Sequence, residues 1–186
     1  MTEKPVRADA HRNRERLLES ARQAFSSDED KVSLEAIARD AGVGIGTLYR
    51  HFPTREALVE AVYRAELGRL CDSAAELLAL QPADAALRAW MDRFGDYLSA
   101  KREMAGALRA VISSGAVTSS QTRAQMSSAV MAVLKAGTSD GTLRGDVRAE
   151  DVVASLVGIF LACGQPRQRD QAGRMLDLLM DGLRPR

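Results

Sequence analysis

Apolar residues recur along this chain at intervals of three and four, and no segment sustains the two-residue alternation that is typical of a β-strand. Clusters of Gly, Pro, Ser and Asp interrupt this pattern and mark the expected ends of helices. The breaks lie at 26–30, 41–44, 52–54, 81–84, 113–120, 137–146 and 164–169. The pattern predicts an all-α fold of about nine helices, in which a small N-terminal module of short helices precedes a larger helical body.

Composition limits the classes to which the protein can belong. Of its 186 residues, 46% are apolar and 27% are charged, close to the average of soluble globular proteins. The longest nearly unbroken apolar stretch, residues 152–163, is shorter than the roughly 20 residues that a membrane-spanning helix needs. The charged N-terminus has no signal-peptide pattern. We therefore expect a soluble cytoplasmic protein with no membrane partner.

Few residues are suited to catalysis or metal binding. The two histidines, His11 and His51, stand far apart, and no nucleophile, glycine-rich phosphate loop or group of metal ligands has a useful spacing. Cys71 and Cys163 are also far apart in the sequence, and we interpret them as reduced core thiols, with a zinc site or a structural disulfide as the alternative. We expect no catalytic residue, no metal, no cofactor and hence no enzyme.

The segment from residue 33 to residue 52 has the features of a helix-turn-helix. Ser33 can cap a helix that runs to about Asp40, because its hydroxyl can accept a free N–H of the first turn. Gly42 in the connection can adopt the positive φ that a tight turn needs. Pro53 ends the following helix at about His51. The apolar side chains expected between the two helices are those of Ile37, Leu48 and Phe52.

A helical wheel at about 100° per residue tests whether the second of these helices could read DNA. The wheel directs Arg50 outward and places Ile45 on the buried side. An outward arginine suits the O6 and N7 atoms of guanine, and flanking donors suit phosphates. Thr54 can cap the next helix, whose free first-turn N–H groups suit another phosphate. The residues that we expect at DNA are Ser33, Gly46, Thr47, Tyr49, Arg50, His51, Thr54 and Arg55.

This motif resembles the DNA-binding domain of TetR/AcrR-family transcriptional regulators. The similarity covers roughly residues 10–64 and is carried by SLEAIA at 33–38 and GVGIGTLYRHFPTREAL at 42–58. It implies that Tyr49 and His51 contact phosphates. Members of the family often have lysine at the start of the next helix, where this sequence has Thr54 and Arg55. We expect a DNA-binding domain over residues 10–56 and a double-stranded DNA operator as its partner.

Residues 86–111 and 178–184 are similar to the SbtR-like group of C-terminal domains in that family, which implies a helical body for ligand binding and dimerisation over residues 57–186. Within it, the apolar side chains of residues 87–98 span only about 120° of a helix. Such a stripe fits either the lining of an effector pocket or ordinary core. The candidate ligand-binding residues are Trp90, Met91, Phe94, Tyr97, Met104, Leu108, Met126 and Phe160.

Two C-terminal segments, residues 152–163 and 175–183, have more apolar side chains than one buried stripe needs. One face can pack on the core of the chain, and the other can pack on the same surface of a second subunit. A central helix within a monomer is the alternative. The residues expected at the homodimer interface are Val153, Leu156, Val157, Phe160, Leu176, Leu179, Met180 and Leu183.

These features predict a ligand-responsive transcriptional repressor of the bacterial cytoplasm and nucleoid. It would bind a pseudo-palindromic operator as a homodimer and be released by an unknown small-molecule effector. Residues 1–64 have 11 basic and 11 acidic side chains, a balance that departs from the usual DNA-binding module. The cations that could form a basic arm are Lys4, Arg7, Arg12, Arg14 and Arg16. Two alternatives stay open: a helical ligand-sensing protein that uses the helix-turn-helix for protein contacts, and an all-α enzyme.

Overall fold

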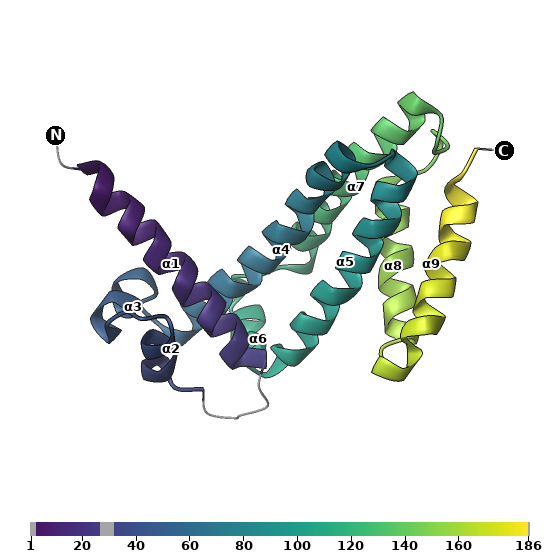
Figure 1. Cartoon of the computed structure of the whole chain (residues 1–186). Coiled ribbons are helices and arrows are strands. Elements are labelled where there is room, and N and C mark those ends of the chain that lie inside the picture. Colours follow the sequence, from purple (N-terminus) through teal and green to yellow (C-terminus); the bar gives the residue numbers. More distant parts are fainter. Residues whose placement is uncertain (1–2, 27–31, 186) are drawn as a thin grey trace. The chain divides into compact units, whose positions relative to one another are not determined.

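The computed structural model describes residues 3–26 and 32–185, and over these ranges it is helical, with nine α-helices, one short 3-10 helix and no strand. The α-helices are α1 (Glu3–Ser26), α2 (Leu34–Asp40), α3 (Ile45–His51), α4 (Arg55–Leu80), α5 (Ala83–Glu103), α6 (Ala105–Ser113), α7 (Ser119–Asp140), α8 (Ala149–Ala162) and α9 (Arg169–Leu183) (Figure 1). The predicted all-α class is confirmed. No helix in the described ranges is both long and apolar enough to cross a bilayer.

One helix boundary has no signal in the sequence. α5 ends at Glu103 and α6 begins at Ala105, with Met104 between them at φ −85° and ψ 4°. No cluster of turn-forming residues marks this point, and none of the expected breaks lies there. The Met104 side chain is buried, so apolar packing accompanies the change of direction. The break expected at 26–30 lies largely outside the described residues.

The chain packs as two compact units. The first unit takes in the chain up to Glu66 together with Ala100–Val117, and the second takes in Leu67–Ser99 together with Thr118–Arg186. Because α4 continues without interruption past Glu66, its first turns belong to the first unit and the rest to the second. The functional boundary expected between residues 56 and 57 does not coincide with this division and stays a prediction.

The core of the first unit lies where α1, α2 and α3 pack on one another. α1 contributes the apolar stripe of Leu17, Ala21 and Phe25, whose side chains are at most 4% exposed. Opposite them, Ile37 of α2 and Leu48 of α3 are 1% and 0% exposed. The spacing of four between the buried residues of α1 is that of one helix face, so the core of this unit follows directly from the periodicity of the sequence.

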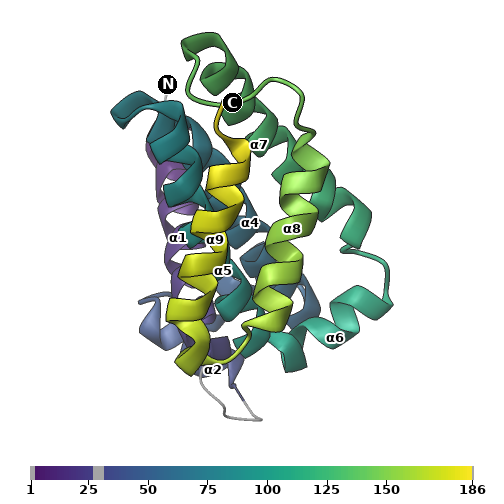
Figure 2. The same cartoon turned by 90° about the vertical axis from the view of Figure 1, so that its right-hand side faces the viewer.

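In the second unit, α8 packs between α7 and α9 (Figures 1 and 2). Gly141, at φ 74°, ends α7 in the left-handed conformation that favours glycine. The loop that follows fastens the end of α9, because the backbone N–H of Arg144 donates to the Leu183 carbonyl at 2.9 Å. The Arg144 guanidinium donates to the Gly182 carbonyl at 3.3 Å and to both carboxylate oxygens of Asp146 at 2.7 Å.

The role of Arg144 at the end of α9 generates a stability prediction. The last carbonyls of a helix lack intrahelical donors, and Arg144 supplies one from its side chain. We expect Arg144→Ala to lower the free energy of unfolding by about 1 kcal/mol, which corresponds to a fall in Tm of roughly 2–4 °C measured by circular dichroism. The control is Arg184→Ala, which removes an exposed pair with Asp181 and should change stability by less than about 0.5 kcal/mol. Equal losses of stability in the two variants would contradict the assignment of Arg144 as a donor to the end of α9.

Candidate nucleic-acid interface

The turn between α2 and α3 determines the direction in which α3 leaves the small core. Gly42 has φ 66°, in the left-handed region that side chains disfavour. The Gly42 N–H donates to the Arg39 carbonyl and the Val43 N–H donates to the Ala38 carbonyl, both at 2.9 Å. These are the two hydrogen bonds of a Schellman motif, with Gly42 directly after the C-cap Ala41. The positive φ predicted for Gly42 is confirmed.

The start of α2 is capped as predicted. The Ser33 hydroxyl accepts from the Ala36 N–H at 3.3 Å and donates to the Glu35 carboxylate at 2.7 Å. The second of these bonds holds the pKa of Glu35 below its usual value. Ser33 is exposed, and its contact with DNA stays a prediction because the structure assigns its hydroxyl to the cap.

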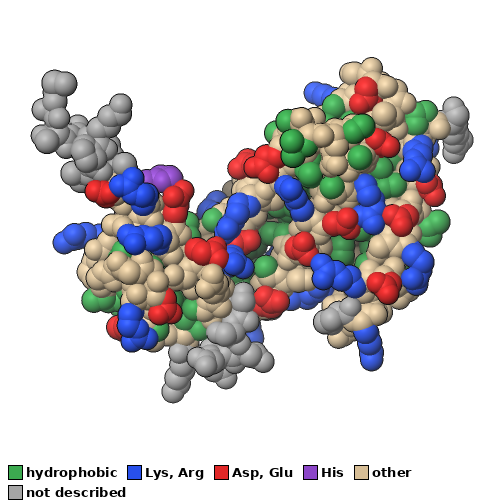
Figure 3. All heavy atoms as spheres, in the orientation of Figure 1, with side chains coloured by type: hydrophobic (Ala, Val, Ile, Leu, Met, Phe, Trp, Pro, Cys, Tyr) green, Lys and Arg blue, Asp and Glu red, His purple; other side chains and the backbone are tan. Residues whose placement is uncertain are grey.

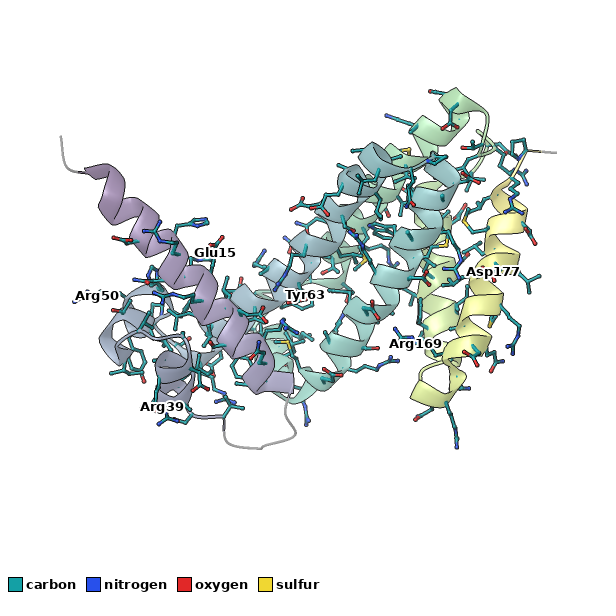
Figure 4. All side chains as sticks on the ribbon, viewed as in Figure 1. Glu15, Arg39, Arg50, Tyr63, Arg169 and Asp177 are labelled. Atoms are coloured by element: carbon teal, nitrogen blue, oxygen red, sulfur yellow. The ribbon has the colours of Figure 1, made fainter. Side chains whose placement is uncertain are left out.

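α3 separates an apolar side from a polar one. Leu48 is fully buried, and Phe52, which caps the helix, is 3% exposed. Arg50 is exposed and extends away from α3 (Figure 4). Among the described residues it has neither an ion pair nor a hydrogen bond. The predicted residues that share the accessible side of this helix are Gly46, Thr47, Tyr49, Arg50 and His51.

Ile45 does not lie where the helical wheel places it. Its side chain is 37% exposed, although the wheel assigns it to the buried side. Ile45 is the first residue of α3 and follows the N-cap Gly44, so no earlier turn of the helix covers it. Because Cβ atoms tilt toward the N-terminus of a helix, the side chain extends past the packed part of α3. The expectation that Ile45 is buried is wrong.

The start of α4 is held by Thr54 and Arg55. Thr54 caps the helix, since its hydroxyl accepts from the Ala57 N–H at 3.1 Å, as predicted. The Arg55 guanidinium donates to the Val32 carbonyl at 2.5 Å and lies 5.2 Å from the centroid of the Phe25 ring. These contacts fasten the start of α4 to α1 and to the segment before α2. A phosphate contact by Arg55 stays a prediction.

Arg14 has a role that sequence reasoning missed, because the sequence suggested only a basic arm for it. Its guanidinium lies 5.5 Å from the centroid of the Phe52 ring, a cation–π geometry at the end of α3. A groove of about 470 Å³ lies beside this contact and is lined by Arg14, His51 and Phe52 together with residues of α4, among them three alanines. A spacing of 38 residues between Arg14 and Phe52 gives no local signal.

Many charges of the first unit neutralise one another, and Figure 3 shows the two signs interspersed on the face that it displays. Its ion pairs include Arg12–Asp9, Arg22–Glu19, Arg64–Glu60 and His11–Glu15, the last of which is charged only when the histidine is protonated. The side chains of Lys4 and Arg7 lie outside the described part of the chain. Of the remaining predicted arm cations, Arg14 and Arg16 are exposed and Arg16 bonds Asn13.

Comparison with known proteins connects this geometry to a family. Residues 17–62 match the model for bacterial regulatory proteins of the tetR family, and residues 81–185 match the model for the C-terminal domain of SbtR-like transcriptional regulators. A TetR transcriptional regulator from Streptomyces coelicolor, known from its crystal structure, is 52% identical in sequence and has a TM-score of 0.81. The match covers 92% of this chain and 98% of the Streptomyces chain. The chain belongs to the TetR family. The predicted resemblance is thereby confirmed.

Two further relatives are similar to this chain. A TetR transcription regulatory protein from Mycobacterium vanbaalenii is 34% identical with a TM-score of 0.75, over 97% of this chain and 100% of that one. An HTH-type transcriptional regulator of Staphylococcus aureus (strain USA300) is 38% identical over 63 residues, which are 33% of this chain and 34% of that protein. The chain thus spans about a third of the length of the curated relatives that it matches. TetR is a family of DNA-binding transcriptional regulators.

In this TetR-family chain, seven of the eight candidate ligand-binding residues are buried, and Phe160 is half-buried. The ring of Phe94 lies beside those of Trp90, Tyr97 and Phe160, with centroids 5.8 to 6.3 Å from its own. Trp90 also donates from Nε1 to the Leu70 carbonyl at 2.9 Å. Met91 and Met126 are buried in the second unit, whereas Met104 and Leu108 are buried residues of the first. A ligand-binding role for these eight residues stays a prediction.

The candidate dimer residues divide into two groups. Five of them, Val153, Leu156, Leu176, Met180 and Leu183, are at most 4% exposed, because they face the core of their own chain. A homodimer role for these five stays a prediction. Val157, Phe160 and Leu179 are half-buried. The large apolar side chains that α8 and α9 do expose are Leu161, at 79%, and Leu178, at 71%.

The conformation of Gly42 generates a prediction for the turn. We expect Gly42→Ala to lower the free energy of unfolding by about 1–2 kcal/mol, because φ 66° brings a Cβ close to the following carbonyl oxygen. The measurement is thermal or urea unfolding. Gly68→Ala is the control, since Gly68 lies within α4 and a Cβ there meets no atom within 4 Å, so this variant should not lose stability. A loss of the same size in Gly68→Ala would show that the backbone conformation of Gly42 is not the cause.

Proposed function

We propose that this TetR-family chain is a homodimeric, effector-responsive repressor whose two α3 helices enter successive major grooves of a pseudo-palindromic operator. The observation that carries the proposal is the accessible face of α3, on which Arg50 is exposed and has no partner in the described residues. The major groove admits an α-helix and displays a distinct pattern of donors and acceptors for each base pair. Two-fold symmetry places the half-sites one helical turn, about 34 Å, or a small multiple apart.

Each accessible residue of α3 has a role in the proposed complex. Arg50 donates to the O6 and N7 atoms of a guanine, the usual pairing of arginine in the major groove. Thr47 contacts a base edge, and Gly46 lets the backbone approach closely. Tyr49 and His51, on opposite flanks, donate to phosphates and so fix the position of the helix without reading sequence. The capped start of α4 offers its free N–H groups to a further phosphate.

The dimer is formed by the outer faces of α8 and α9. These two helices lie side by side (Figure 2), and the exposed Leu161 and Leu178 place apolar surface on each. Around Leu161, the exposed residues of α8 are small: Ala154, Ser155, Gly158 and Ala162. Small residues allow close approach of helices, and a two-fold axis through this face would bring four helices together. The interface is therefore proposed on these residues and on the half-buried Val157 and Leu179.

Effector control requires a ligand that binds the two states of the dimer with different affinities. α4 is the element suited to transmit that difference, because one continuous helix supplies turns to both compact units. The aromatic group around Phe94 in the second unit is the proposed place where an apolar effector is sensed. Binding there would favour a state in which the two α3 helices have the wrong separation for the operator.

The proposed role of Arg50 is tested by operator binding. Duplexes are first selected from a randomised library by mobility shift at low salt, where phosphate contacts are strongest. Arg50→Ala should then cost about 1–3 kcal/mol and relax the preference at one base of each half-site. Tyr49→Phe and His51→Ala should weaken binding to all sequences alike. If Arg50→Ala weakens all duplexes equally, its assignment as a base reader is wrong, and if the wild type retains no duplex, DNA binding is wrong.

The proposed interface is tested by light scattering at micromolar concentration. We expect twice the chain mass for the wild type and a lower mass for Leu161→Glu and Leu178→Glu, because each places a charge in an apolar contact. Leu80→Glu is the matched control, since Leu80 is a leucine of α4 that is 81% exposed outside the proposed face. A monomeric wild type would rule out the interface, and dissociation of the Leu80→Glu variant would show that the face is assigned incorrectly.

A further inference from the structure

One flank of the accessible face of α3 is apolar. Ile45 is 37% exposed and Tyr49 is 45% exposed, and both are large side chains that the fold leaves accessible. They stand at positions i and i+4, so they lie on the same side of the helix, one turn apart. An exposed isoleucine is not needed for the fold, since Leu48 and Phe52 already fill the core beneath α3. The apolar flank is therefore available to a partner outside the chain.

The order of side chains around α3 restricts what that partner can be. At 100° per residue, Gly46 lies between the apolar flank and Arg50. A Cβ built on Gly46 would meet no atom within 4 Å. The face thus consists of an apolar edge, then a gap, and then the Arg50 guanidinium, which has no partner among the described residues. A surface that fits it must offer an apolar group close to a hydrogen-bond acceptor.

We infer that Ile45 reads the C5-methyl group of a thymine near the base that Arg50 contacts. Among the edges of the four bases, the methyl of thymine is the one apolar group displayed in the major groove, and guanine offers the acceptors that suit arginine. The inference rests on the proposed function, because it requires α3 to lie in that groove. It adds a second, chemically different determinant of specificity to Arg50.

Helix geometry sets the distance between the two bases. Ile45 and Arg50 are five residues apart, which corresponds to about 7.5 Å along the axis of α3. Successive bases of one strand are about 3.4 Å apart. When α3 follows the groove, the thymine therefore lies within about two base pairs of the guanine in each half-site. A phosphate wall offers no apolar group, so Ile45 gains nothing from a backbone contact.

Uracil provides the test, because deoxyuridine lacks only the C5-methyl group and keeps the pairing of thymine. Each thymine in a half-site selected with the full-length wild type is replaced in turn, and Kd is measured at fixed salt. Burial of one methyl corresponds to about fourfold in Kd. We expect this loss at one thymine per half-site and about fifteenfold when both half-sites are changed. Ile45→Ala should bind the thymine and uracil duplexes equally.

The matched control is Ile112→Ala, which removes the same atoms from an isoleucine of α6 that is 50% exposed. This variant should discriminate thymine from uracil as the wild type does. The inference is overturned if no thymine lies within about two base pairs of the Arg50-dependent guanine, if no replacement by uracil weakens binding, or if Ile45→Ala still discriminates. In those cases an Arg50-dependent base preference leaves the proposed function intact. If the wild type selects no duplex at all, the proposed function fails and the inference fails with it.

Discussion

The left-handed backbone of Gly42 is the constraint on which the arrangement of α3 depends. It allows the Schellman hydrogen bonds that end α2, and these determine the direction in which α3 begins. Because a helix turns by about 100° per residue, that direction also decides which side chains are covered. Leu48 and Phe52 are placed in the core, and Arg50, on the opposite side, is left in solvent. A residue with a Cβ at position 42 would disfavour this turn and would therefore alter the placement of all three side chains together.

The local features of this region could be read from the sequence because each depends on neighbouring residues. The Ser33 cap, the Thr54 cap and the positive φ of Gly42 all arise within one turn of the chain. The wheel failed at Ile45 because it treats every residue as if a full turn preceded it. Sequence also gave no sign of the contact between Arg14 and Phe52, since these residues meet only after α1 and α3 have packed.

The same distinction explains the result for α8 and α9. Their sequences show that each helix has more apolar surface than one face can use, but not which face the chain itself covers. In the structure Leu156 and Leu176 are turned inward, whereas Leu161 and Leu178, of the same size, are exposed. The orientation of α9 is supported by ion pairs with α5, Arg88–Asp177 at 2.8 Å and Arg169–Asp96 at 3.0 Å; Arg169 and Asp177 are labelled in Figure 4. Pairs that are more than 70 residues apart in the chain leave no periodic pattern.

The balance of charges in the first unit has a consequence for how a duplex would be recognised. Ion pairs such as Arg12–Asp9 and Arg64–Glu60 cancel cations that could otherwise build a long-range attractive field. Cations already neutralised by the protein also release fewer counterions from DNA. Long-range attraction of a duplex to this unit is therefore weak, and discrimination between DNA sequences depends on groups that contact the bases directly. Arg50, left without a carboxylate in the described chain, keeps its full capacity to donate to a base, and the apolar flank beside it is insensitive to salt.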